Sequence, residues 1–322
     1  MDDRLPTVER DASAVQSLPL LIHVGYPKAA STWLQNIVFQ DEDAGFYAPW
    51  GLASGPATDQ FVLANAFSFS ADAARKVFEE GLKTAAERNL VPVLSQETLV
   101  GSQIRGRYWG KEAADRMHSV FPDARILIIL REQKSMILSS YREHIKKGGL
   151  NKIERFIGVE NRKPGFGPMC RLDFLEYDIL ISYYQNQFGS ENVLVLPFEL
   201  LKKNRLDFLQ KIGFFVGIEN LKDFPQKPQN VGFHGVTMKF RRQLNYWFQA
   251  DDFGGKSIPF NWRVVQKLSW IFDRVVPESV HEQAERELKD FIAQSVAGKF
   301  GASNRKTSEL IGIDLADFGY DC

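Results

Sequence analysis

The sequence predicts an α/β fold, in which helices flank a central, mostly parallel β-sheet. Four short apolar runs carry this prediction, at residues 20–24, 91–95, 125–130 and 192–197. They lack the polar alternation of a half-buried strand, and such runs are typical of parallel strands that are buried on both faces. Helical patterns lie between the runs, and this alternation of strand and helix favours a parallel sheet.

The expected helices are the segments with apolar residues at helical spacing. They cover residues 31–38, 61–69, 71–88, 133–147, 169–188, 205–216 and 278–299. In the helix at 71–88 the apolar positions run from Ala74 to Ala85 along one face. Gly148 and Gly149 end the helix at 133–147. We expect residues 1–18 to be a polar N-terminal segment and residues 19–322 to form a single domain.

Composition and charge are those of an ordinary globular protein. Of 322 residues, 44% are hydrophobic and 25% are charged, and 40 Lys and Arg balance 40 Asp and Glu. A nucleic-acid-binding protein is more often basic, so we expect no nucleic-acid partner. The two cysteines, Cys170 and Cys322, are too few for a disulfide framework. No apolar stretch approaches membrane-spanning length, so we expect no integral membrane segment and a cytoplasmic location.

The stretch after the first apolar run predicts an anion-binding loop. Gly25 and Pro27 end the strand, and a helix begins at Ser31. The first N–H groups of a helix have no intrahelical partner, and the helix dipole adds positive charge there. Lys28 supplies a full positive charge, and Ser31 and Thr32 supply hydroxyl donors. The alternative is an ordinary strand-to-helix turn with a solvated lysine and a capping serine.

The residue order of this loop does not fit a Walker A motif, which needs a lysine directly before Ser or Thr and a glycine before that lysine. Residues 26–34 instead read Tyr-Pro-Lys-Ala-Ala-Ser-Thr-Trp-Leu. This order resembles the 5′-phosphosulfate-binding loop of sulfotransferases that use 3′-phosphoadenosine 5′-phosphosulfate. The resemblance assigns donor binding to Lys28, Ala29, Ala30, Ser31, Thr32 and Trp33.

The family loop usually runs Tyr-Pro-Lys-Ser-Gly-Thr-Thr-Trp, so Ala29, Ala30 and Ser31 depart from it. Ala30 in place of glycine is the departure with a physical consequence, because an alanine limits the backbone if φ must be positive.

A second motif follows the third apolar run. Arg131 comes directly after 125–130, at the carboxyl edge of the expected sheet, where ligands of open α/β sheets collect. Ser139 follows two helical turns later. An arginine can grip a phosphate with two parallel hydrogen bonds, and a serine can donate one more. This spacing resembles the 3′-phosphate motif of the same sulfotransferases, although Glu132 and Gln133 replace its usual Asn-Pro. The alternative is an exposed arginine and a solvent-facing serine.

Glu97 is the candidate general base. It comes just past the strand at 91–95, on the ligand side of a parallel sheet. The family often carries a carboxylate or a histidine in this region, next to the reacting hydroxyl, and such a group takes the proton of the acceptor. The alternative is a glutamate that starts a helix and stabilises its dipole.

A late polar loop, residues 227–235, supplies two further candidates. Many sulfotransferases close the nucleotide with a basic or Asn-bearing loop in this region, so the resemblance gives Lys227 and Asn230 a place in donor binding. The fuller Arg-Lys-Gly pattern of the cytosolic small-molecule enzymes is absent.

The histidines provide reserve candidates. His144, in the helix at 133–147, and His234, in the late loop, are candidates for substrate contact and for the base if Glu97 does not serve. His281 is expected to be an exposed helix residue. No His, Cys, Asp or Glu spacing suggests a metal, and the resemblance implies none.

The resemblance implies a P-loop-like sulfotransferase of a bacterial, carbohydrate or glycan type. Such an enzyme transfers a sulfuryl group from its donor to an acceptor hydroxyl on a small molecule, a saccharide or a glycolipid, with Lys28 stabilising the leaving phosphate. The glycan class rests on a likeness of the C-terminal tail, residues 300–315, to bacterial glycan-type members. Two alternatives remain, a P-loop-like small-molecule kinase and a non-catalytic glycan-binding relative. The sequence leaves the oligomeric state open.

Overall fold

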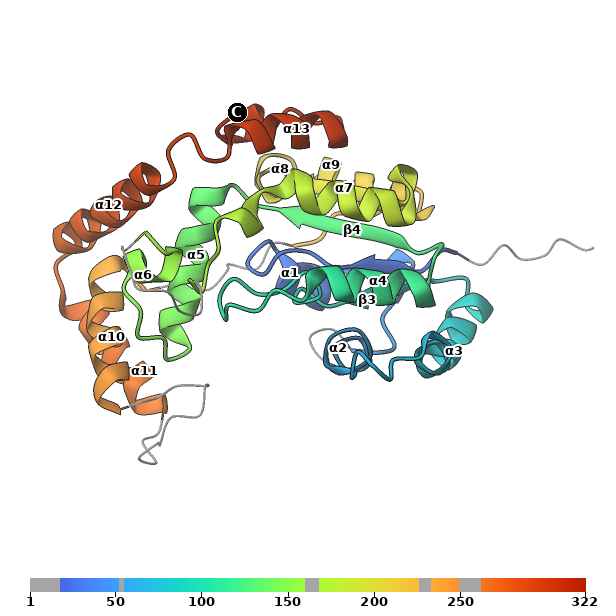
Figure 1. Ribbon diagram of the computed structural model, residues 1–322, viewed down its shortest axis with the longest axis horizontal. Coiled ribbons are helices and arrows are strands. Elements are labelled where there is room, and N and C mark those ends of the chain that lie inside the picture. The colour runs from blue at the N-terminus through green and yellow to red at the C-terminus, as the bar shows by residue number, and fades with distance from the viewer. Residues whose placement is uncertain (1–17, 52–54, 160–167, 226–232, 249–261) are drawn as a thin grey trace, which may run out of the picture.

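The computed structural model describes residues 18–51, 55–159, 168–225, 233–248 and 262–322. At its centre lies a five-stranded sheet in the order β2-β3-β1-β4-β5, in which all neighbouring strands are parallel. The strands are β1 (Leu21–His23), β2 (Phe46–Tyr47), β3 (Val91–Ser95), β4 (Arg125–Leu130) and β5 (Val193–Pro197). The prediction of an α/β fold with a parallel central sheet is confirmed (Figure 1).

Burial explains why the four apolar runs form strands. β1 and β3 are buried along their whole length, and β4 is buried from Ile126 to Leu130. A strand covered on both faces has no solvent side to reserve for polar residues, so its sequence shows no alternation. The short edge strand β2 had no such signal, because only Phe46 and Tyr47 pair with β3.

The sheet has a topological switch point between β1 and β4. After β1 the chain continues to β2 and β3 on one side, and after β4 it continues to β5 on the other side. Open α/β sheets bind ligands outside the carboxyl ends of the strands at such a point. The loops that leave β1 and β4 carry Lys28 and Arg131, so the fold brings the two predicted motifs together.

Helices surround the sheet. Those among the described residues are α1 (Ser31–Trp33), α2 (Pro56–Thr58), α3 (Ala71–Glu87), α4 (Gly110–Val120), α5 (Gln133–Lys146), α6 (Ile153–Ile157), α7 (Tyr177–Phe188), α8 (Phe198–Lys203), α9 (Arg205–Val216), α10 (Gly235–Phe248), α11 (Trp262–Val275), α12 (Glu278–Ser295) and α13 (Gly301–Ile311). A π-helical segment, Leu34–Val38, continues α1.

The prediction of a helix over residues 61–69 is wrong. A π-helical segment, Asp59–Leu63, ends there instead. The side chain of Asn65 then accepts a hydrogen bond from the backbone N–H of Phe67 at 3.0 Å. Such a local side-chain bond offers the backbone an alternative to the helix, so the chain turns.

The helix expected at 169–188 begins only at Tyr177. The backbone N–H of Cys170 donates to the carbonyl oxygen of Phe156 at 2.9 Å, and Arg171 forms an ion pair with Asp173. These contacts hold the segment against α6 and out of an α-helix, with a 3-10 turn at Asp173–Leu175 before α7 begins. The other expected helices with clear patterns agree with α3, α5, α9 and α12 to within a few residues.

One hydrophobic core runs through the described residues, from Leu20 to Tyr320. α7 packs on β4 and β5, α9 packs on β5, and α3 packs on β3. Beyond the sheet, α10 and α12 pack against α5, and α11 packs on α10. We call α10, α11 and α12 the helical arm; Figure 1 shows it at one end of the molecule. No helix among the described residues combines the length and the apolar character that crossing a membrane requires.

Candidate active site

The loop between β1 and α1 has a backbone that glycine usually supplies. Lys28 has φ 75° and Ala30 has φ 63°, both in the left-handed region. Ala30 is the N-cap of α1, and its carbonyl oxygen accepts hydrogen bonds from the N–H groups of Trp33 (2.9 Å) and Leu34 (3.1 Å). The departure at Ala30 therefore falls where φ is positive, at a cost of about 1–2 kcal/mol for a residue with a Cβ.

The first turn of α1 presents a buried donor. Ser31 is 2% exposed, and its Oγ has no hydrogen-bond partner among the described residues. Ala29 and Trp33 are buried beside it, and Thr32 is exposed. A buried hydroxyl left without a partner costs about 1–3 kcal/mol. Ser31 Oγ is therefore a position where a ligand oxygen would restore a missing hydrogen bond.

Arg131 ties the second motif to the first. Its Nη1 donates to the carbonyl oxygen of Lys28 at 2.8 Å, and its guanidinium lies 5.3 Å from the centroid of the Phe198 ring. Tyr177 Oη donates to the Arg131 carbonyl oxygen at 2.6 Å. Arg131 Nε is buried and has no partner among the described residues. Burial lowers the pKa of Arg131, but an arginine stays charged, so the site holds a partly desolvated cation.

A carboxylate that the sequence analysis did not single out holds Lys28. Lys28 Nζ lies 3.2 Å from Glu143 Oε2 in α5, and Lys147 Nζ lies 3.6 Å from the other oxygen of that carboxylate. Ser139 precedes Glu143 by one helical turn, so both residues lie on the same face of α5. The helix face that meets Lys28 is therefore the face that carries Ser139. This i, i+4 relation to Ser139 was the signal that identifies Glu143.

Two carboxylates near Lys28 have pKa values shifted in opposite directions. Burial raises the pKa of Glu97, and Ser31 and Lys28 oppose this shift only in part. The Ser31 hydroxyl is near enough to favour ionised Glu97, although it does not meet hydrogen-bond geometry. Burial also acts to raise the pKa of Glu143, but Lys28, Lys146 and Lys147 outweigh it, so the pKa of Glu143 is lowered. Lys28 thus acts on two carboxylates, of which Glu97 is the weaker acid and Glu143 the stronger.

Lys227 and Asn230 lie outside the described residues. Pro225, the last described residue before that segment, lies next to the start of α1, because Trp33 Nε1 donates to its carbonyl oxygen at 3.2 Å.

His144 is packed in the interior. It is buried, its ring centroid lies 5.1 Å from that of Phe156 in α6, and its Nε2 lies 3.3 Å from Asn151 Nδ2. The contacts with Phe156 and Asn151 are those of a packed helix residue, and neither of them joins His144 to Lys28.

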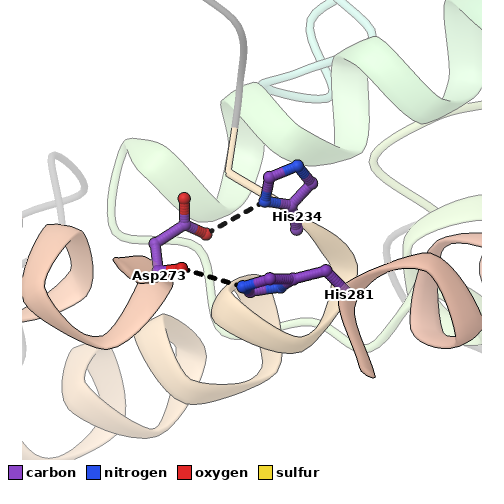
Figure 2. A group of neighbouring side chains, drawn as sticks. All are labelled: His234, Asp273 and His281. Carbon is purple, nitrogen blue, oxygen red and sulfur yellow. Dashed lines mark hydrogen bonds and ion pairs between the residues drawn. The ribbon is translucent and has the colours of Figure 1, made fainter. Parts of the chain in front are cut away.

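His234 belongs to a different cluster, in the helical arm. Figure 2 shows His234, Asp273 and His281 together, from the start of α10, the end of α11 and the start of α12. His234 Nδ1 lies 3.4 Å from Asp273 Oδ1, which also accepts from Thr237 Oγ1 at 2.5 Å. One possible metal-ligand atom from each of the three residues lies within 4.8 Å of the others. The three residues are far apart in the sequence, so no rule of residue spacing could identify this group.

The expectation that His281 is exposed is wrong. His281 is buried, its ring centroid lies 4.4 Å from that of His234, and its Nε2 lies 2.8 Å from the carbonyl oxygen of Asp273. A carbonyl only accepts, so Nε2 carries the proton. The face of α12 that meets α11 buries this histidine, and the sequence of α12 alone does not reveal that neighbour.

Comparisons with known proteins give a fold. No family model and no curated protein matches the chain. A solved sulfotransferase from Alicyclobacillus acidocaldarius matches with a TM-score of 0.53 and 14% identity, over 94% of this chain and 98% of that one. Mouse sulfotransferase SULT7A1 complexed with PAP matches with a TM-score of 0.34 and 14% identity, over 64% of this chain and 60% of that one. The sulfotransferase domain of the curacin biosynthetic pathway matches with a TM-score of 0.36 and 15% identity, over 74% of this chain and 82% of that one. The last two scores are too low to carry an argument. The first shows that the chain has the fold of a sulfotransferase.

Proposed function

We propose that this chain is an enzyme that transfers a sulfuryl group from 3′-phosphoadenosine 5′-phosphosulfate to an acceptor hydroxyl, with residues 19–322 as a single domain. The observation that carries the proposal is a pair of buried donors without described partners, Ser31 Oγ and Arg131 Nε. They lie on the two loops that meet at the switch point, beside Lys28. Buried donors are normally satisfied, and an anion with several oxygens is the ligand that would satisfy both.

The residues present fit the two phosphate-bearing ends of this donor. In the proposal the N–H groups and hydroxyls at the start of α1 hold the 5′-phosphosulfate, through Ala29, Ala30, Ser31, Thr32 and Trp33. Arg131 and Ser139 hold the 3′-phosphate, which ATP and AMP lack. Lys227 and Asn230 are included on the family resemblance alone.

Lys28 has the role of charge stabilisation in this proposal. The donor supplies a bond to sulfur whose cleavage leaves negative charge on a phosphate oxygen. Lys28 Nζ is a cation in the same loop, and it forms an ion pair with Glu143. A fixed cation that meets charge developing in the transition state is worth more than one in water, because the site is partly shielded from solvent.

Glu97 has the role of general base. Its raised pKa makes it a stronger proton acceptor than an ordinary glutamate, while Glu143 beside it stays ionised and pairs with Lys28. Environments that push the pKa values of two neighbouring carboxylates apart often separate their roles. The acceptor is proposed to be a small molecule or a saccharide, the latter on the likeness of the C-terminal tail, and the setting a bacterial cytoplasm.

Thermal unfolding with three nucleotides tests the proposal. Adenosine 3′,5′-bisphosphate should raise the thermal unfolding midpoint of the full chain more than ATP with magnesium or AMP at the same concentration, because the site is proposed to bind it most tightly. A ligand at about 100 times its dissociation constant adds about 2.7 kcal/mol to the free energy of unfolding. A larger shift with ATP and magnesium would favour the kinase alternative. No shift with any nucleotide would favour a glycan-binding protein without a donor site.

A further inference from the structure

The outward side of α11 consists of apolar and basic residues only. Five apolar side chains on it are exposed: Val264 39%, Leu268 38%, Trp270 48%, Ile271 44% and Val275 73%. The other exposed residues of α11 whose side chains are described are Arg263, Lys267 and Arg274. An ordinary surface helix presents charged and polar residues of both signs on its outer face.

The exposed apolar residues are ordered along the helix. Val264, Leu268, Ile271 and Val275 follow one another at intervals of four, three and four residues, so they form a single stripe on one face. Arg263, Lys267, Trp270 and Arg274 form a neighbouring stripe with the same intervals, and Arg274 lies 3.6 Å from the Trp270 ring centroid. We call these two stripes the α11 face.

The opposite side of α11 accounts for its attachment to the arm. Val265 and Ser269 are buried, and the Phe272 ring stacks on that of Phe240 in α10 at 4.1 Å. Gln266 Oε1 accepts from Arg241 of α10 at 2.7 Å. The helix is therefore held to α10 by its inner side, and the exposed stripe lies on the side turned away from these contacts.

The neighbouring end of α10 adds exposed aromatic residues. Tyr246 is 63% exposed and Trp247 is 71% exposed. The pairs Arg241–Gln266 and His234–Asp273 show that α10 and α11 run in opposite directions. Tyr246 and Trp247 therefore lie at the same end of this helix pair as Val264. Figure 1 shows α10 and α11 at the end of the molecule that the arm forms.

Charge identifies the kind of surface that this face fits. The one acidic residue of α11, Asp273, is turned inward to Thr237 and His234, so the exposed charges of the helix are all positive. An apolar stripe bordered by cations and Trp complements a layer that is anionic outside and apolar a few ångströms below. Lys and Arg can keep their charges at the headgroups while Trp and Tyr occupy the interface.

We propose that the α11 face binds the surface of an anionic phospholipid bilayer. The helix has 14 residues and is about 21 Å long, too short to span a bilayer, so it lies in the plane of the interface. This proposal is independent of the sulfuryl-transfer reaction, because none of the residues of the α11 face belongs to the Lys28 site.

Vesicle co-sedimentation of the full chain tests the proposal. The chain should pellet with vesicles of phosphatidylcholine and phosphatidylglycerol, much less with vesicles of phosphatidylcholine alone, and less as salt rises. The double variant Leu268→Glu/Ile271→Glu should lower the partition coefficient at least about tenfold, because it removes two apolar side chains from the interface. Lys267→Gln/Arg274→Gln should lower it on anionic vesicles and reduce the salt dependence, because Arg263 is then the one exposed cation left on the described α11 face.

Phe214→Glu is the matched control. Phe214 in α9 is 89% exposed and lies outside the arm, so its replacement should leave vesicle binding unchanged. All positions changed are on the surface, and an unchanged unfolding midpoint verifies that each variant is folded. Absence of binding to anionic vesicles overturns the proposal, and so does an equal loss in Phe214→Glu. A concentration-dependent dimer in sedimentation velocity that Leu268→Glu/Ile271→Glu abolishes would assign the face to a second copy of the chain instead.

Discussion

The site at the carboxyl ends of β1 and β4, here called the sheet edge, and the helical arm depart in opposite ways from the rule that charged groups are exposed and apolar groups are buried. At the sheet edge, ionisable groups are drawn partly out of water: Arg131, Glu97 and Glu143 all have pKa values shifted by burial or by a neighbouring charge. In the arm, Trp270 and Val275 are left in water although they are large and apolar. Both arrangements cost free energy of folding unless something else binds there.

The difference indicates two kinds of binding. A site that buries charge and leaves donors such as Ser31 Oγ without a partner in the described part of the chain is suited to a small anion, which fits into the protein. A convex helix that exposes apolar residues and cations is suited to a large surface, against which the protein lies. Changes at the two regions should therefore affect different properties: catalysis and nucleotide affinity at the sheet edge, association in the arm.

The largest effect is expected for Glu97→Gln. This change keeps the size of the side chain but removes its basicity, so the rate should fall by about 10²–10⁴-fold while the affinity for adenosine 3′,5′-bisphosphate stays the same. Turnover with the acceptor and nucleotide titration measure the two properties separately. Full activity in Glu97→Gln would transfer the role of base to another residue.

The same variant has a pH signature. The base acts when it is ionised, and burial raises the pKa of Glu97, so the rate should fall as pH decreases through a value above that of an ordinary glutamate. Glu97→Gln should lack this acid limb. A limb that persists in the variant would belong to a different group.

Lys28→Ala should lower turnover by about 10²–10³-fold and weaken product binding much less, because the charge of Lys28 matters most as the leaving oxygen becomes anionic. Lys83→Ala, on the exposed surface of α3, is the control and should leave turnover unchanged. Equal losses of turnover and of product affinity in Lys28→Ala would make Lys28 a binding residue only.

A stability effect of the next size is expected within the β1–α1 loop. Ala30→Gly removes the strain of a positive φ but adds unfolded-state freedom, so the free energy of unfolding should rise by about 0.5–1 kcal/mol. Ala29→Gly is the matched control: it lies next to Ala30, is buried and has no positive φ, so it should lower that free energy. Denaturant unfolding measures both, and the same sign for the two variants would contradict the account.

The smallest effect is expected in the arm. Ile271→Ala should change the free energy of unfolding by no more than about 0.5 kcal/mol, because Ile271 is an exposed residue of the α11 face. Ile292→Ala, at a buried position of α12, should lower it by about 2–5 kcal/mol. A comparable loss for Ile271→Ala would mean that the α11 face packs against the protein itself.

The sequence predicted the parts of the fold whose signal is local. The runs that became β1, β3, β4 and β5 are buried on both faces, and each therefore reads as an apolar segment without reference to the rest of the chain. Arg131 and Lys28 were also predictable as neighbours, because both follow parallel strands and the carboxyl ends of parallel strands meet at one edge.

The parts that sequence reasoning missed depend on contacts between distant segments. Glu143 pairs with Lys28 across 115 positions of the chain, and its place one helical turn after Ser139 was the one local signal for it. His281 was expected to be an exposed helix residue, yet it is buried beside His234 and Asp273. The helix expected at 169–188 started late because Cys170 is bonded to Phe156 of another helix. In each case tertiary contacts outweighed local propensity.

Titration of Arg131→Ala with two nucleotides tests the central claim most directly. Adenosine 3′,5′-bisphosphate and AMP differ in the 3′-phosphate, so loss of Arg131 should weaken the first by about 10–150-fold, or about 1.5–3 kcal/mol, and the second by less than about threefold. Arg88→Ala, which breaks a surface ion pair with Glu42, should change neither affinity. Equal weakening of both nucleotides by Arg131→Ala, or of neither, would contradict the assignment of the sheet edge as a site for this sulfuryl donor.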